Sequence, residues 1–143
     1  MNKAKVLFLC TSNAARSQMA EAFLKKHGGD RYDAYSAGTD SKGINPYTEK
    51  VMKEMGISLT DQYSKHVKEY MGKAHFGYLI TVCGEADKNC PTVFPGISQK
   101  IQWSFEDPAA LLGTEEEKLT KFREVRDQIE QRVKEWLREQ QGK

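Results

Sequence analysis

A cysteine and an arginine lie close together near the start of the chain, separated by five small or polar residues. Cys10 precedes this segment, and Arg16 and Ser17 follow it. A cysteine thiolate is a strong nucleophile, and an arginine guanidinium can hold two oxygens of a tetrahedral anion. The spacing predicts a site where Cys10 attacks the central atom of a small oxyanion that Arg16 holds. The structural alternative is a buried, unreactive cysteine.

The segments on either side of this loop should position it. Lys5 to Cys10 is short and apolar, as in a buried strand, and the apolar residues after Ser17 fall on one face of a helix. A helix N-terminus offers unpaired backbone N–H groups and the positive end of a dipole, which favour a bound anion and a thiolate. Ser17 could also donate its hydroxyl hydrogen to the sulfur. We expect six residues to bind the oxyanion: Thr11, Ser12, Asn13, Ala14, Ala15 and Arg16.

A proton donor is also needed, because an oxygen that leaves the central atom must be protonated. Phe105-Glu-Asp-Pro108 supplies two carboxylates. The residue before a proline is held in an extended conformation, which projects its side chain from the loop. Asp107 and Glu106 are therefore both candidates for the general acid. The structural alternative is that Asp107 only starts a turn.

Two further cysteines, Cys83 and Cys90, complete an odd total of three, which argues against a structural disulfide framework. Cys83 ends a second apolar run and should therefore lie at the same sheet edge as Cys10. In a helix, Cys83 and Cys90 would be about 10 Å apart along the axis, beyond the roughly 4.4–6.8 Å that a disulfide spans. The intervening residues disfavour a helix, so the two could still approach. Unrelated structural cysteines, or a zinc site lacking nearby histidines, are the alternatives.

Five segments give the chain a resemblance to the low-molecular-weight protein tyrosine phosphatase superfamily, and within it to the thioredoxin-coupled arsenate reductases. They are Val6–Glu21, Tyr35–Gly38, Gly56–Ile57, Cys83–Cys90 and Asp107–Pro108. The resemblance implies reduction of arsenate to arsenite, with phosphate or sulfate as competing oxyanions. It implies that Asp107, before Pro108, is the general acid, with Glu106 as the alternative. It also implies a relay in which Cys83 attacks the Cys10 sulfur, Cys90 then attacks Cys83, and thioredoxin or a similar dithiol reductant reduces the last disulfide.

Two other functions remain open from the sequence. A protein tyrosine phosphatase of the same superfamily would hydrolyse phosphotyrosine through a cysteinyl-phosphate and would need neither Cys83 nor Cys90. A non-catalytic oxyanion-binding module is a third possibility, against which the intact Cys10, Arg16 and Asp107 count. Reduction needs two electrons, and the two additional thiols could supply them, so we favour the reductase.

Some members of the superfamily bind a potassium ion, and three residues here match that pattern: Asn13, Glu21 and Ser36. Further ligands would come from the segment after Gly56, where the chain has Tyr63 and Lys65. A lysine does not bind a cation, so we expect no metal and no other cofactor. Asn13 is better interpreted as a brace of the loop through side-chain hydrogen bonds.

Length and composition are those of a single globular domain over residues 1–143. The net charge of +2 and the even spread of basic residues argue against nucleic-acid binding. The apolar runs are too short for a membrane span or a signal peptide core. We therefore expect a cytoplasmic protein with no membrane contact, and a monomer.

Strands that alternate with helices predict an α/β fold with a parallel sheet. The resemblance implies a three-layer sandwich, in which a four-stranded parallel sheet has helices on both faces. The expected strands are Lys5–Cys10, Tyr32–Ala37, Phe76–Cys83 and Lys100–Phe105. The expected helices begin at Ser17, at Pro46 after an Asn45 cap, at Ser64 for a short helix to Met71, and after a Thr114 capping box for a long helix that frays beyond Leu137.

Overall fold

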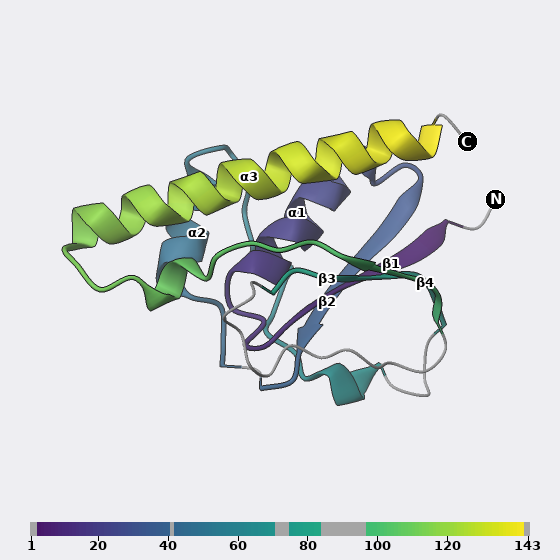
Figure 1. Ribbon diagram of the computed structural model, residues 1–143, viewed down its shortest axis with the longest axis horizontal. Coiled ribbons are helices and arrows are strands. Elements are labelled where there is room, and N and C mark those ends of the chain that lie inside the picture. The colour runs from purple at the N-terminus through teal and green to yellow at the C-terminus, as the bar shows by residue number, and fades with distance from the viewer. Residues whose placement is uncertain (1–2, 41, 71–74, 84–96, 142–143) are drawn as a thin grey trace.

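A computed structural model describes residues 3–40, 42–70, 75–83 and 97–141 of the chain. Its centre is a four-stranded sheet in the order β2-β1-β3-β4, in which every neighbouring pair of strands is parallel (Figure 1). The strands are β1 (Ala4–Cys10), β2 (Tyr32–Gly38), β3 (Phe76–Thr81) and β4 (Ile97–Gln102). The predicted α/β fold with a four-stranded parallel sheet is confirmed.

Three α-helices pack on one face of the sheet: α1 (Arg16–Gly28), α2 (Pro46–Lys53) and α3 (Glu115–Gln141) (Figure 1). Val6 and Phe8 point from β1 into this layer, where both are fully buried. The apolar stripe of α3 covers α1 and α2, as its three- and four-residue spacing predicts. The capping box is also present, because Glu117 N–H donates to Thr114 Oγ1 and Thr114 N–H donates to Glu117 Oε1, both at 3.2 Å.

The opposite face buries the alternate residues of β1, Leu7 and Leu9, together with Leu79 of β3. A short 3₁₀ helix, η1 (Val67–Glu69), packs on this face through Val67. Tyr35 and Tyr70 pack against the same cluster. The sheet therefore has helical structure on both faces, although in the described part of the chain the second layer is much the thinner.

Some predicted element boundaries are wrong. The helix expected from Ser64 to Met71 is reduced to η1, and Met71 lies outside the described residues. The Lys65 carbonyl instead accepts a hydrogen bond from the Gly38 N–H at 2.8 Å, which holds this segment in an extended form beside the end of β2. Such a bond depends on tertiary contacts, which local propensity does not report.

The last strand and the last helix also differ from the prediction. β4 begins at Ile97 and ends at Gln102. The Trp103 N–H still donates to the Thr81 carbonyl at 2.8 Å, and Ser104 and Phe105 lie beyond the strand. β3 ends at Thr81, two residues before Cys83. The long helix continues to Gln141, beyond the expected end of order at Leu137. Trp136 and Leu137 are both buried, and their packing supports this last part of α3.

None of the helices in the described ranges is both long enough and apolar enough to cross a membrane.

Candidate active site

The loop between β1 and α1 has its carbonyl groups turned outwards. The Thr11 carbonyl accepts from the Asp40 N–H at 2.9 Å, and the Ala14 carbonyl accepts from the Asn45 N–H at 3.0 Å. The Ser12 carbonyl accepts from the Lys42 N–H, and the Asn13 carbonyl accepts from Gln18 Nε2. In a trans peptide the N–H points opposite to the C=O, so the N–H groups that follow these carbonyls point towards the inside of the loop. Such a ring of N–H groups is an anion-binding concavity.

Cys10 lies at the base of this concavity. Its sulfur accepts a hydrogen bond from the Asn13 N–H at 3.3 Å and lies 2.9 Å from Ser17 Oγ. Asn13 Nδ2 donates to Ser17 Oγ at 2.7 Å, so the serine oxygen already has a donor and its own hydrogen can point to the sulfur. Two hydrogen-bond donors can therefore be directed at the Cys10 sulfur.

Asn13 braces the loop with every polar atom of its side chain. Asn13 Oδ1 accepts from the Lys65 backbone N–H at 2.8 Å and from Gln18 Nε2 at 2.9 Å. The Lys65 N–H can only donate, so the orientation of the amide is fixed. Asn13 also has a φ of +51°, the left-handed region that a concave run of N–H groups requires.

Arg16 and Asp107 come together from distant parts of the chain. Arg16 Nη2 lies 3.8 Å from Asp107 Oδ2, and Arg16 Nη1 donates to the Phe105 carbonyl at 3.0 Å. Arg16 is almost fully buried, whereas the Asp107 side chain is 38% exposed. Asp107 Oδ1 also accepts from the Ala109 N–H and so caps η2 (Pro108–Ala110). Asp107 can therefore start a turn and lie close to Arg16 at the same time.

Glu106 points elsewhere. Its carboxylate forms an ion pair with Lys121 of α3 at 2.5 Å, and its side chain is 73% exposed. Of the two carboxylates that the sequence offers as a general acid, Asp107 is the one that pairs with Arg16 of the oxyanion-binding loop.

Cys83 lies at the same edge of the sheet as Cys10. β1 and β3 are neighbours, Leu9 is paired with Thr81, and the Val82 N–H donates to the Leu9 carbonyl at 3.0 Å. Cys83 therefore lies one residue beyond the position level with Cys10 on the adjacent strand. Both side chains belong to one buried cluster. Cys90 lies outside the described residues.

Gly38 ends β2 directly beside the oxyanion-binding loop, opposite Cys10 in the register. A Cβ atom at this position would lie 2.5 Å from the Thr11 carbonyl oxygen and 2.9 Å from the Asn13 nitrogen. Both of those atoms are backbone, so neither can move without moving the loop. The close approach therefore requires glycine.

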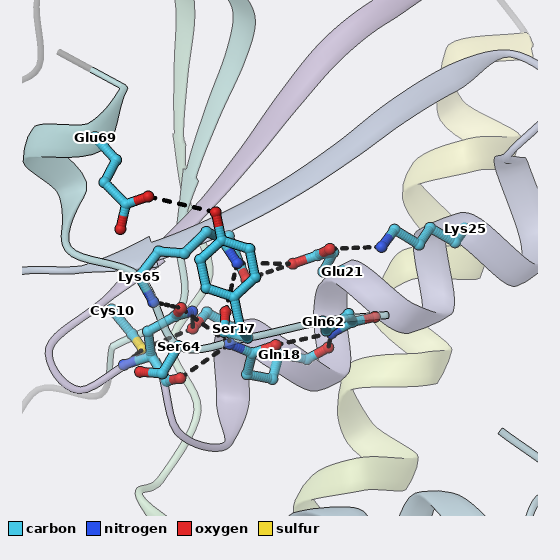
Figure 2. Close-up of polar contacts among 12 residues, drawn as sticks. Cys10, Ser17, Gln18, Glu21, Lys25, Gln62, Ser64, Lys65 and Glu69 are labelled. Atoms are coloured by element: carbon cyan, nitrogen blue, oxygen red, sulfur yellow. Dashed lines mark hydrogen bonds and ion pairs between the residues drawn. The ribbon is translucent and has the colours of Figure 1, made fainter. Parts of the chain in front are cut away.

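A buried polar network supports the loop from the side of α1 (Figure 2). Lys65 Nζ donates to the Tyr63 carbonyl at 2.6 Å and lies 3.9 Å from Glu21 Oε1. Glu21 also accepts from Ser36 Oγ and pairs with Lys25. Of the three residues matched to a potassium pattern, Glu21 thus lies near a lysine ammonium, Ser36 bonds to Glu21, and Asn13 bonds to the backbone of the same lysine. Within the described ranges, no group of three or more His, Cys, Asp or Glu side chains is placed to hold a metal ion.

Sequence patterns missed part of this network. Gln62 Nε2 donates to Gln18 Oε1 at 2.8 Å, and Ser64 Oγ donates to the Ser12 carbonyl at 3.2 Å. Lys65 was expected only to exclude a metal. These contacts join residues more than 40 positions apart in the chain, and no local spacing indicates them.

Comparison with known proteins agrees with this geometry. The family model described as low molecular weight phosphotyrosine protein phosphatase matches residues 5–143. An arsenate reductase from Halalkalibacterium halodurans is 46% identical over 135 residues, which are 94% of this chain and 95% of that protein.

The chain is also similar to solved structures of arsenate reductases. A structure described as an arsenate reductase in the phosphate binding state superposes with a TM-score of 0.77 at 29% identity, covering 95% of this chain and 98% of that one. A thioredoxin-dependent arsenate reductase from Corynebacterium glutamicum has a TM-score of 0.69 at 27% identity, covering 97% of this chain and 62% of that one. With its strand–loop–helix site and a family match over almost its whole length, the chain belongs to the low molecular weight phosphotyrosine protein phosphatase family.

Proposed function

We propose that this protein reduces arsenate to arsenite, with Cys10, Cys83 and Cys90 passing the oxidation outwards. The observation that carries the proposal is the position of Cys83. It follows β3 at the same edge of the sheet where Cys10 ends β1, in the same buried cluster. Hydrolysis through a cysteinyl-phosphate would not require a second cysteine there. The similar proteins named arsenate reductase support the same substrate.

The first step uses the residues of the oxyanion-binding loop. The Cys10 thiolate attacks arsenic while the inward N–H groups and Arg16 hold the oxyanion oxygens. Asp107 donates a proton to a hydroxyl group of the arsenate, which then leaves as water. Arsenic is now bonded to the Cys10 sulfur and is still in its oxidised state.

Reduction occurs in the second step. The Cys83 thiolate attacks the Cys10 sulfur, a sulfur–sulfur bond forms, and the electron pair of the sulfur–arsenic bond stays with arsenic, which leaves as arsenite. Two thiols are oxidised to one disulfide, which balances the two electrons that arsenic gains. Cys90 then attacks Cys83 and releases the Cys10 thiolate.

The remaining disulfide needs an external dithiol, for which thioredoxin is our proposal. A solved structure with the same fold is described as a thioredoxin-dependent arsenate reductase. Such a carrier operates in a reducing compartment, so we also propose that the protein acts in the cytoplasm. We further propose that residues 1–143 form a single domain. Phosphate and sulfate share the shape and charge of arsenate and should compete for the loop.

A coupled assay tests the proposal. The purified protein is incubated with thioredoxin, thioredoxin reductase and NADPH, and NADPH loss is followed with and without arsenate. Arsenate-dependent consumption is the expected result. Turnover of para-nitrophenyl phosphate without any arsenate-dependent consumption would instead identify a phosphatase and would contradict the proposal.

Replacing Asp107 with asparagine should slow arsenate reduction by about a hundredfold, because the amide cannot supply the proton. The measurement is kcat/KM for arsenate in the coupled assay. Glu106→Gln is the matched control, since Glu106 is the neighbouring carboxylate and pairs with Lys121. If Glu106→Gln has the larger effect, the assignment of the general acid is wrong.

A further inference from the structure

Lys65 is a charged side chain buried to 96%, and the reaction steps above do not use it. Its ammonium donates to the Tyr63 carbonyl at 2.6 Å, lies 3.9 Å from Glu21 Oε1, and sits 4.4 Å from the centre of the Tyr63 ring. Burying a charge without a partner is costly, so an arrangement of this kind needs an explanation.

The backbone of Lys65 is part of the support of the nucleophile. Its N–H donates to Asn13 Oδ1 at 2.8 Å, Asn13 Nδ2 donates to Ser17 Oγ at 2.7 Å, and Ser17 Oγ lies 2.9 Å from the Cys10 sulfur. Four residues thus form one continuous hydrogen-bonded chain from Lys65 to the reacting atom. The position of Lys65 therefore affects the position of the sulfur.

The Lys65 ammonium holds the Lys65 backbone in place through two contacts, one with the Tyr63 carbonyl and one with Glu21. The Tyr63 carbonyl accepts both from Lys65 Nζ and from Gln18 Nε2 of α1, so it joins the segment to the helix that starts at the loop. Glu21 lies one turn after Ser17 on the same helix. Figure 2 shows Lys65 reaching from the side of the loop towards Glu21, while Lys25 contacts Glu21 from the other side.

The positive charge of Lys65 also offsets the negative charge of Glu21. Glu21 is only 5% exposed, and its negative charge lies one helical turn from the residues that must hold a thiolate and an anion. Lys25 also pairs with it, but the Lys25 side chain is 44% exposed, so water screens that contact. Of the two lysines that pair with Glu21, Lys65 is the buried one. Burial lowers the pKa of Lys65, an effect that Glu21 opposes.

We propose that Lys65 is a positioning residue, whose ammonium is a built-in counter-ion for Glu21. It holds the segment Tyr63–Lys65 against the oxyanion-binding loop and prevents the charge of Glu21 from opposing the Cys10 thiolate and the bound anion. The role rests on Cys10 being the reacting sulfur of the proposed function. The test of the Lys65 role, however, requires no arsenate reduction. The Lys65 role and the proposed arsenate reduction can therefore fail separately.

A groove of about 610 Å³ makes chemical rescue possible, since both Lys65 and Glu21 line it. In Lys65→Ala, alkylation of Cys10 by iodoacetamide at neutral pH, followed by peptide mass spectrometry, should slow about threefold to tenfold. The phosphate concentration that gives half-protection should rise by a similar factor. Ethylammonium should restore both values, whereas tetramethylammonium, which has no N–H donor, should not.

Lys25→Ala is the matched control, because it removes the other cation from the same carboxylate. Its exposed contact predicts an effect of less than about twofold. The proposal is overturned if ethylammonium leaves a folded Lys65→Ala protein unchanged, or if Lys25→Ala shows the larger effect. Lys65→Met keeps the packing of the side chain without the charge. If Lys65→Ala does not fold, Lys65→Met takes its place in the test. Alkylation and phosphate protection at wild-type levels in Lys65→Met would then overturn the proposal.

Discussion

Replacing Cys83 or Cys90 with serine is expected to abolish continuous arsenate turnover with thioredoxin, but at two different steps. In Cys83→Ser nothing attacks the Cys10 sulfur, so no arsenite leaves the protein. In Cys90→Ser that attack still occurs, so each chain releases a single equivalent of arsenite and then stops with Cys10 and Cys83 joined. A serine hydroxyl cannot form the disulfide that either step requires.

Quantifying arsenite after mixing pre-reduced protein with arsenate, in the absence of thioredoxin, separates the two variants. Cys10→Ser is the control for a protein that cannot start the reaction. Iodoacetamide labelling of the remaining thiols identifies which sulfurs are oxidised after the single turnover. Sustained turnover in Cys90→Ser would show that a different thiol completes the cycle, and the three-cysteine relay would then be wrong.

Replacing Gly38 with alanine is expected to reduce kcat/KM for arsenate by about a thousandfold. The added Cβ would lie 2.5 Å from the Thr11 carbonyl oxygen, 2.9 Å from the Asn13 nitrogen and 3.1 Å from the Asn13 Cβ. The loop must move away, and several donors to the oxyanion then lose their positions together. The loss of a single such donor already costs about a hundredfold to a thousandfold.

Gly77→Ala is the matched control, since it places the same methyl group on a glycine of the same sheet. The nearest atom to a Cβ there is the Lys5 carbonyl oxygen at 3.7 Å, an ordinary contact distance. Thermal unfolding of both variants separates a local change in the loop from a loss of the fold. Near wild-type activity in Gly38→Ala would mean that the loop tolerates displacement.

Local sequence determined the parts of the site that could be predicted. Cys10, Arg16 and Ser17 belong to one strand–loop–helix unit, so spacing alone places them together. Asp107 was favoured over Glu106 because Asp107–Pro108 resembles the superfamily's general-acid motif, and the following proline also restricts its backbone. In each case the relevant physics acts over a few residues of chain.

Contacts between distant segments determined the parts that could not be predicted. The segment around Lys65 was expected to be helical, yet its hydrogen bonds with Gly38 and Asn13 hold it extended. The pair Gln18 and Gln62 has no pattern in the chain, because each residue alone is an ordinary polar side chain. Such tertiary bonds override local propensity and become visible only when the fold has brought the segments together.

The outward-bonded carbonyls of the oxyanion-binding loop have a consequence for substrate choice. Partners from outside the loop fix its shape before any ligand arrives, so an incoming anion need not order it. A preformed cradle recognises shape and charge, which arsenate shares with phosphate. We therefore expect the protein to sample phosphate continually in cells and to release it. Selectivity would then arise after binding, because only arsenic accepts the electron pair when its bond to sulfur is broken.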